Sequence, residues 1–175
     1  MSHPTGSRPI ATAELSDNDP SGLSITGLYV SPGHNFFGHH GKLPGEYPLL
    51  GVDKVLCRAG RGIEGDRFFD HGSDYRGQIT FFSLEVYDDL CRSLEVWDKH
   101  PGVFRRNAIT TGDDLNRYIG RDLEIQGVRF RGVAECSPCH WMDGAFGPGC
   151  AAHLKGRGGL RARILTDGVL RVPRA

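Results

Sequence analysis

The sequence predicts a single mainly β domain, a compact β-barrel with one or two short covering helices. Most segments with a regular hydrophobic pattern are short, rich in β-branched and aromatic residues, and separated by turns that contain glycine. Only one segment has a clear helical period. A chain of 175 residues has room for one substantial core and hardly for two. Together these observations favour one layered β domain over a helical or two-domain protein.

The N-terminal half is expected to supply three strands. Residues 1–22 are rich in Ser, Pro, Thr and Asp and have no apolar period, so they predict a disordered tail ahead of a domain spanning 23–175. The β-branched and aromatic content of 23–31, 49–57 and 78–82 predicts a strand in each segment.

One helix follows the third of these strands. Ser83 is a suitable N-cap, and Tyr87, Leu90, Cys91 and Leu94 follow it at the spacing of one helical face. Because packing against the core already explains this stripe, Cys91 is interpreted as a small buried hydrophobic residue.

The C-terminal half is again mainly strands. Residues 107–112 read as a strand, and 113–120 as a short helix with Asp113 as its cap. Two further segments, 121–135 and 160–172, each contain a Gln-Gly or Asp-Gly dipeptide between apolar runs. Such dipeptides are typical of tight hairpin turns, so each segment predicts a pair of adjacent strands.

The composition excludes several functional classes. The chain has 21 basic and 21 acidic side chains and zero formal charge, which argues against a nucleic-acid partner. It contains no apolar run of about 18 residues and no export signal, so we expect a cytoplasmic protein without a membrane partner. An odd number of cysteines, five, in such a chain indicates reduced thiols rather than a disulfide framework.

A cluster of cysteines and histidines near the C-terminus raises three interpretations. The segment AECSPCHWMDGAFGPGCAAH contains a C-x-x-C-H string, which in another context attaches haem. Haem attachment is disfavoured because the chain has no export signal and the motif runs into a glycine-rich loop. A zinc site made by Cys136, Cys139, Cys150 and His153 stays open. The third interpretation is that only one of these thiols is functional.

Three stretches in order resemble the MOSC domain, named after the C-terminal domain of molybdenum cofactor sulfurase. They are GRGIEGDRF (60–68), FRRNAITTGDDLNRYIGRDLEI (104–125) and ECSPCHWMD (135–143). The resemblance covers about residues 23–172 and implies a mainly β, barrel-like fold. Phe68 stands where many members have a histidine. The sulfurase's aminotransferase-like domain is absent from this chain, so no pyridoxal phosphate is expected.

The resemblance implies a site for the molybdenum cofactor, molybdopterin. Cys139 matches the cysteine associated with molybdenum, and would be both metal ligand and catalytic residue. A thiolate is a soft ligand suited to this metal. Cys136 is expected to pack beside the site rather than bind the metal. Arg105 and Asn107 match an Arg-x-Asn segment that lies near the cofactor, and Arg105 could hold the cofactor's phosphate through its planar fork.

Further cofactor-binding candidates lie in the glycine-rich loops. Arg67 is one phosphate candidate, and Lys42 and His40 are two more, although a plain surface loop explains the last two equally well. Asp66 is expected to hold its own loop by accepting backbone hydrogen bonds. Arg106 is expected on the opposite strand face from its neighbours, exposed to solvent.

Two classes of function follow from the resemblance. The first is a reductase of N-hydroxylated compounds, with a small-molecule substrate and an external electron-donor protein. The second is a carrier that delivers the cofactor, or sulfur as a Cys139 persulfide, to an accepting enzyme. The long glycine-rich loops 32–48 and 58–77 favour the reductase, because they are long enough to wall a small-molecule pocket.

Overall fold

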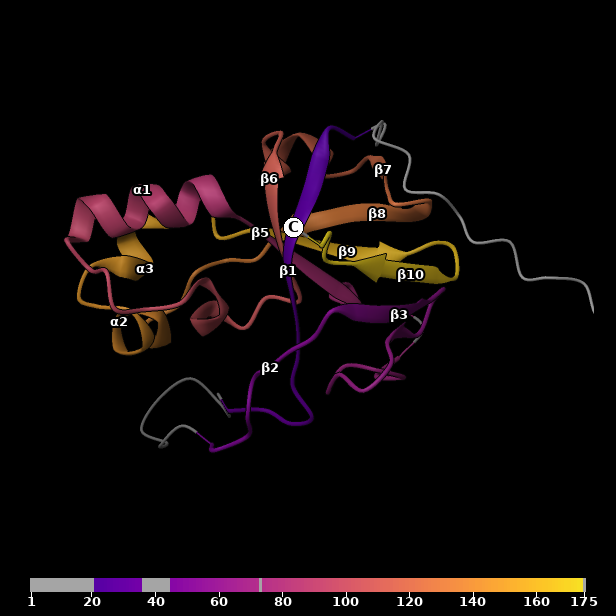
Figure 1. Cartoon of the computed structure of the whole chain (residues 1–175), viewed down its shortest axis with the longest axis horizontal. Helices are drawn as coiled ribbons and strands as arrows, with labels where there is room; N and C mark the ends of the chain where they lie inside the picture. Colours follow the sequence, from indigo (N-terminus) through magenta and orange to yellow (C-terminus); the bar gives the residue numbers. More distant parts are fainter. Residues whose placement is uncertain (1–20, 36–44, 73, 175) are drawn as a thin grey trace, which may run out of the picture.

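The protein folds into two β-sheets with a group of helices on one side (Figure 1). The structure is a computed structural model, and it describes residues 21–35, 45–72 and 74–174. The larger sheet has seven strands in the order β2 (Leu50–Gly51), β1 (Leu23–Val30), β6 (Ala108–Gly112), β5 (Ile79–Ser83), β9 (Leu160–Ile164), β8 (Val128–Glu135), β7 (Asp122–Ile125). The smaller sheet has the order β10 (Gly168–Arg171), β3 (Lys54–Arg58), β4 (Gly62–Ile63).

Strands β5 and β6 are parallel neighbours, whereas the other described strand pairs are antiparallel. Parallel neighbours need a crossover connection. Here the connection contains helix α1 (Leu84–Leu94) and the 3₁₀ helix η1 (Pro101–Phe104). The crossover therefore places η1 directly before β6, at the centre of the larger sheet.

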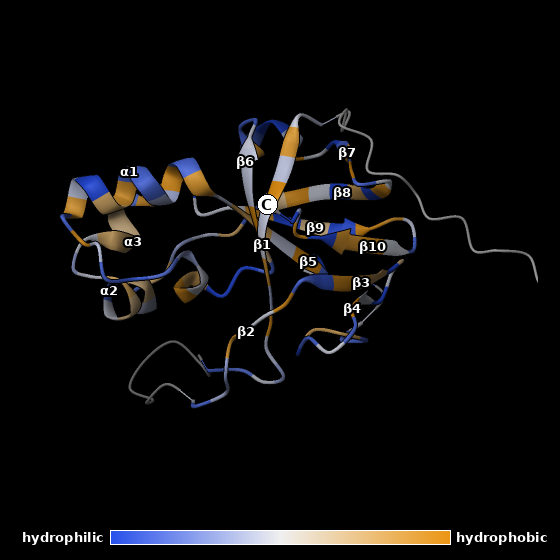
Figure 2. Ribbon diagram, in the orientation of Figure 1, coloured by the Kyte–Doolittle hydropathy of each residue, from blue (hydrophilic) through white to orange (hydrophobic). Residues whose placement is uncertain are grey.

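The sheet separates two hydrophobic cores. Phe81 of β5 packs edge-on against Phe130 in the core between the sheets. Its neighbour Phe82 points the other way and packs against Phe104 of η1. This second core lies under α1 and the short helices α2 (Trp141–Ala145) and α3 (Cys150–His153). Both faces of β5 are thus buried, and Figure 2 shows hydrophobic residues on this strand and along one stripe of α1.

The main expectations about local structure are confirmed. The Ser83 hydroxyl caps α1 by accepting a hydrogen bond from the Val86 amide (3.2 Å), and Cys91 is buried on the inner face of the helix. Gln126 and Gly127, at φ of 51° and 76°, form the tight turn between β7 and β8. The mainly β, barrel-like architecture with few short helices is as predicted.

One prediction of a strand and one of a hairpin need correction. The segment 49–57 is divided into β2 and β3, which belong to different sheets. The segment 160–172 is not a hairpin, because β9 pairs with β5 and β8 whereas β10 pairs with β3. The Asp167 carboxylate explains the change of sheet: it accepts a hydrogen bond from the Ala59 amide (2.8 Å), which holds the corner against the end of β3.

The helices also differ in detail from the sequence expectation. Residues 113–120 contain a 3₁₀ helix, η2 (Leu115–Tyr118), whose cap is Asp114 rather than Asp113. The Asp114 carboxylate accepts from the Asn116 amide (3.0 Å). Helices α2 and α3 lie in the glycine-rich segment where no helix was expected. In the described part of the chain, none of the helices has both the length and the apolar character needed to cross a lipid bilayer.

Candidate functional site

A pocket of about 100 Å³ lies where η1, α2 and the loop after β4 meet. A cysteine, three arginines and several apolar residues line it. Its lining residues are Arg67, Val103, Phe104, Arg105, Arg106, Cys139, Trp141, Met142 and Ala145. The structure therefore brings together Cys139, Arg105 and Arg67 from the predicted site, although they lie far apart in the sequence.

Cys139 is the accessible thiol of this protein. It is half-buried, whereas the other four cysteines, all within the described ranges, are buried. Its carbonyl accepts a hydrogen bond from the Met142 amide (2.9 Å), so its backbone begins the turn that leads into α2. The accessible thiol is thus the cysteine that the resemblance associates with molybdenum.

The proposed zinc quartet is not assembled. Cys136 and Cys150 are both buried, at 1% and 0% exposure, and burial raises the pKa of Cys150 to about 12. The His153 ring lies 3.2 Å from the Asp89 carboxylate. Within the described ranges, no three His, Cys, Asp or Glu side chains lie together in a way that would hold a metal ion. The zinc interpretation has no support in this geometry.

Arg105 is buried, and the loop after β1 occupies its guanidinium. The side chain donates to the Ser31 hydroxyl, to the Gly33 carbonyl (3.0 Å) and, at 3.4 Å, to the Tyr47 carbonyl. Burial first, and repulsion from Arg67 second, lower the pKa of Arg105 to about 10. Arg105 is therefore still a cation at neutral pH, but much of its planar fork already holds the protein's own loop.

Arg67 has more donors available for a ligand. Its side chain is only 12% exposed, and burial lowers its pKa from the ordinary value. In the described residues its contacts are a 3.4 Å ion pair with Asp66 and a position over the Phe68 ring, 4.7 Å from the centroid. An arginine has several N–H donors, so most of those of Arg67 can face an anion in the pocket. Arg67 is therefore more available than Arg105 for the phosphate-binding role that was expected of Arg105.

Asn107 lies behind the pocket and does not line it. Its Oδ1 accepts from the amide and the hydroxyl of Thr80 (3.0 and 2.9 Å), and its Nδ2 donates to Asp66 (3.2 Å). Asp66 in turn accepts from the amides of Ser31 and Phe68 (both 3.1 Å), which confirms its expected role in holding the loop. In this arrangement Asn107 supports the carboxylate beside Arg67.

Arg106 was expected to be exposed, and that expectation is wrong. It is half-buried, lines the pocket, and donates to the carbonyls of Phe104 (3.1 Å), Cys136 (3.3 Å) and Gly158 (3.2 Å). The expectation assumed an extended strand through this segment. Arg105 instead has a left-handed backbone (φ 55°) at the end of η1, so the alternation of strand faces does not apply.

Phe68 replaces a histidine of many family members and packs into an aromatic group beside Arg67. Its ring stacks on Tyr75 (4.8 Å between centroids) and meets the edges of His34 (4.8 Å) and His71 (5.6 Å). Burial and the nearby Arg67 lower the pKa of His34, which favours its neutral form. The remaining two cofactor-binding candidates, Lys42 and His40, lie outside the described residues.

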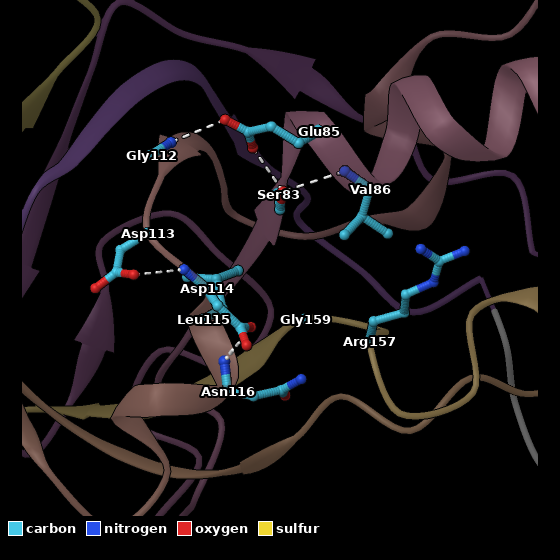
Figure 3. A pocket seen from close by; sticks show the side chains of 10 residues that line it. All are labelled: Ser83, Glu85, Val86, Gly112, Asp113, Asp114, Leu115, Asn116, Arg157 and Gly159. Carbon is cyan, nitrogen blue, oxygen red and sulfur yellow. Dashed lines mark hydrogen bonds between the residues drawn. The ribbon is translucent and has the colours of Figure 1, made fainter.

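A second pocket, of about 250 Å³, lies at the N-terminus of α1 (Figure 3). Its polar groups largely pair with one another. The Glu85 carboxylate accepts from the Ser83 hydroxyl (2.6 Å) and the Gly112 amide (2.9 Å), and Asp113 accepts from the Asp114 amide (2.9 Å). Carboxylates dominate this pocket and no thiol lines it. The smaller pocket is therefore the better candidate for an anionic, metal-bearing ligand.

The sequence matches the model of a protein family over more than half of its length. The family model described as MOSC domain matches residues 65–173, and the chain belongs to this family. No curated protein matches the sequence significantly.

Solved structures show the same fold at low sequence identity. YuaD from Bacillus subtilis is similar with a TM-score of 0.63 and 20% identity, over 86% of this chain and 91% of that one. YiiM from Geobacillus stearothermophilus is similar with a TM-score of 0.59 and 14% identity, over 86% of this chain and 71% of that one. YiiM from Escherichia coli is similar with a TM-score of 0.56 and 16% identity, over 86% of this chain and 65% of that one. At these identities the likeness establishes the fold and nothing finer.

Proposed function

We propose that this protein binds the molybdenum cofactor through Cys139 and reduces N-hydroxylated compounds. One observation carries the proposal: the accessible thiol opens into a pocket that it shares with Arg67, Arg105 and Arg106. MOSC domains are associated with this cofactor, and the pocket offers both kinds of group that the cofactor requires, a soft sulfur ligand and phosphate-binding cations.

The charges of the pocket support an anionic ligand. Three arginines line it, and Asp66 is the carboxylate that pairs with Arg67. Repulsion from Arg67 lowers the pKa of Arg105, and repulsion from Arg106 contributes to the lowered pKa of Arg67. A phosphate would relieve this repulsion, because arginine forks bind phosphate oxygens through charge-assisted hydrogen bonds.

Each residue has a defined part in the proposed site. Cys139 would be the metal ligand, and Arg67 would bind the phosphate, whereas Arg105 and Arg106 would add positive charge while their donors hold backbone carbonyls. Phe104 and Met142 form the apolar side of the pocket and exclude water from it. The cofactor, when bound, supplies the two-electron chemistry. The overall reaction consumes an N-hydroxylated substrate, two electrons and two protons, and yields the reduced nitrogen compound and water.

The electrons would come from an external donor protein. The sequence contains neither the cysteine spacing of an iron–sulfur protein nor a dinucleotide-binding glycine motif. All five cysteines are free thiols, which supports a reducing compartment, and we place the reaction in the cytoplasm.

A carrier of cofactor or sulfur is the second candidate. The small pocket favours the sulfur carrier in particular, since about 100 Å³ is below the roughly 300–1,000 Å³ typical of small-molecule sites and a persulfide needs little space. A carrier needs only one accessible thiol, and Cys139 is such a thiol. Its persulfide would be delivered to an accepting enzyme.

Metal binding is tested by X-ray absorption on protein reconstituted with the cofactor. Cys139→Ser should remove the protein's thiolate from the molybdenum shell, whereas Cys136→Ser, at a buried position, should leave it in place. Equal loss of metal–sulfur scattering in both variants would point to a site with two thiol ligands and contradict the assignment.

Phosphate binding is tested by cofactor retention at fixed ionic strength. Arg67→Gln removes donors worth about 1.5–3 kcal/mol per charge-assisted hydrogen bond, so its affinity should fall at least about tenfold. Arg121→Gln, at an exposed position, serves as the matched control. Equal retention by Arg67→Gln and the control would remove Arg67 from the site.

The reductase and the carrier differ in their products. With an artificial electron donor, cofactor-loaded protein should convert an amidoxime to the amidine, and Cys139→Ala should be severely impaired. A carrier would show no turnover, and mass spectrometry would detect one added sulfur on Cys139 that dithiothreitol removes. Bound cofactor together with that persulfide and no turnover would reverse our preference.

A further inference from the structure

The segment that leads from β8 to Cys139 lies against the chain just before β9. The Cys136 amide donates to the Gly159 carbonyl (2.7 Å), and the Gly158 amide donates to the Glu135 carboxylate (3.0 Å). The first bond, between backbone groups, continues the β8–β9 pairing beyond its last pair, Glu135 with Leu160, and the second adds a side-chain contact beside it. The backbone that carries the functional thiol is therefore attached to β9 as an extension of the sheet.

Gly158 permits an unusually close approach at this contact. A Cβ atom at this position would lie 2.2 Å from the Cys136 carbonyl oxygen and 3.1 Å from Pro138 Cδ. The backbone of Gly158 is outside the left-handed region, so backbone conformation alone does not require glycine there. Glycine is required because any side chain would displace the Cys136 carbonyl.

Arg106 joins three segments at the same place. Its Nε donates to the Gly158 carbonyl (3.2 Å), its Nη1 to Phe104 (3.1 Å) and its Nη2 to Cys136 (3.3 Å). One planar group thus connects the end of η1, the Cys136 segment and the chain before β9. Only a guanidinium has donors spread widely enough for this geometry, since a lysine ammonium is a single point on a flexible stem.

We infer that Arg106 and Gly158 position the Cys139 thiol in the pocket. Arg106 acts as a positioning residue, because it donates to the same Cys136 carbonyl that Gly158 approaches closely, and to the Gly158 carbonyl itself. The inference rests on the proposed function only in taking Cys139 as the functional thiol. It concerns the cofactor-free protein, and its test therefore does not depend on bound molybdenum or on turnover.

The test measures how fast Cys139 is alkylated by iodoacetamide in the folded, cofactor-free protein. Cys139 is the only one of the five cysteines that is not buried, so peptide mapping can follow it separately. Arg106→Lys keeps the positive charge and loses the fork, and Gly158→Ala keeps all charges and adds the clashing Cβ. Both should loosen the segment and accelerate alkylation of Cys139 by about five- to tenfold. Arg121→Lys, at an exposed position, is the matched control and should change the rate less than about twofold.

Three results would overturn the inference. The first is an alkylation rate in both folded variants that equals the control. The second is faster alkylation spread equally over Cys57, Cys91 and Cys150, since these buried thiols report general unfolding. The third is measured in wild-type protein and needs no variant. The inference predicts that the Cys136 and Gly158 amides exchange hydrogen at least about tenfold more slowly than exposed loop amides. Exchange as fast as in those loops would exclude the attachment even if neither variant folds. A failure of cofactor loading would affect the proposed function and leave all of these results unchanged.

Discussion

Replacing Asn107 with alanine should destabilise the fold, because this buried side chain has four hydrogen-bonded contacts. Its Oδ1 accepts from the amide and hydroxyl of Thr80, and its Nδ2 donates to Asp66 (3.2 Å) and to the Tyr29 carbonyl (3.4 Å). Asn107 is 5% exposed, so little water can replace these partners. The substitution leaves the Thr80 amide, in the middle of the sheet, without its acceptor.

The magnitude follows from the groups left unpaired. A buried donor that loses its only partner costs about 1–3 kcal/mol, and the Thr80 amide is such a donor. Asp66 keeps its two backbone amide partners, and the Tyr29 contact is long, so these two losses add less. We expect the free energy of unfolding to fall by about 3 kcal/mol. For a domain of this size the melting temperature should fall by about 6–12 °C.

The assay is urea unfolding followed by circular dichroism, with the slope m compared between variants to confirm two-state behaviour. Asn116→Ala is the matched control: that amide is exposed and donates to the Gly156 carbonyl (2.8 Å), so its loss should cost about 1 kcal/mol or less. Suppose instead that Asn107→Ala loses less than about 1 kcal/mol of stability and retains about tenfold less cofactor. Asn107 would then be a ligand contact, as the family resemblance implies, and the structural reasoning would be refuted.

Three further predictions concern stability. Ser83→Ala removes the hydroxyl that accepts from the Val86 amide, and should cost about 1 kcal/mol in urea unfolding. Gly112→Ala places a Cβ 2.1 Å from the Gly22 carbonyl oxygen, at a backbone φ of 113°. The free energy of unfolding should therefore fall by more than about 2 kcal/mol. A fall of less than about 1 kcal/mol would contradict the close approach of β6 to Gly22, the residue before β1. Burial, with a smaller contribution from Asp167, raises the pKa of Cys57 from 9.0 to about 12. Because the pKa of Cys57 is higher in the folded state, its buried neutral thiol contributes fully to stability below pH 9, and this stabilisation is lost as the pH rises toward 12. Cys57→Ala should therefore flatten the decline in the free energy of unfolding at alkaline pH.

The sequence predicted those parts of the fold that depend on neighbours in the chain. The Ser83 cap, the α1 stripe and the Gln126–Gly127 turn each depend on a few adjacent residues, and each is confirmed. The partner of β10 could not be predicted in this way, because an Asp-Gly dipeptide favours a turn without specifying which strand pairs next. The side chain that changes the outcome, Asp167, contacts Ala59 from more than a hundred residues away.

The candidate site likewise has parts that the sequence predicted and parts that it could not predict. The choice of Cys139 came from the family resemblance, and the structure adds that it is the accessible thiol. The role of Arg106 could not be inferred from strand alternation, because one left-handed residue, Arg105, turns the chain before β6 begins. The different availability of Arg67 and Arg105 depends on the carbonyls of Gly33 and Tyr47, which bind Arg105 and which no local pattern reveals.

The pairing of β3 with β10 has a consequence for the order of events during synthesis. Lys54 pairs with Arg171, so β3 waits for its main partner while the intervening chain is made. At about 5–20 residues per second this interval is on the order of ten seconds. During it, Val55 and Cys57, which are buried in the finished protein, have only the short strand β4 beside them. A nascent chain of this protein therefore exposes an apolar strand edge until β10 has been made, and β3 is where we expect chaperone binding or aggregation to begin.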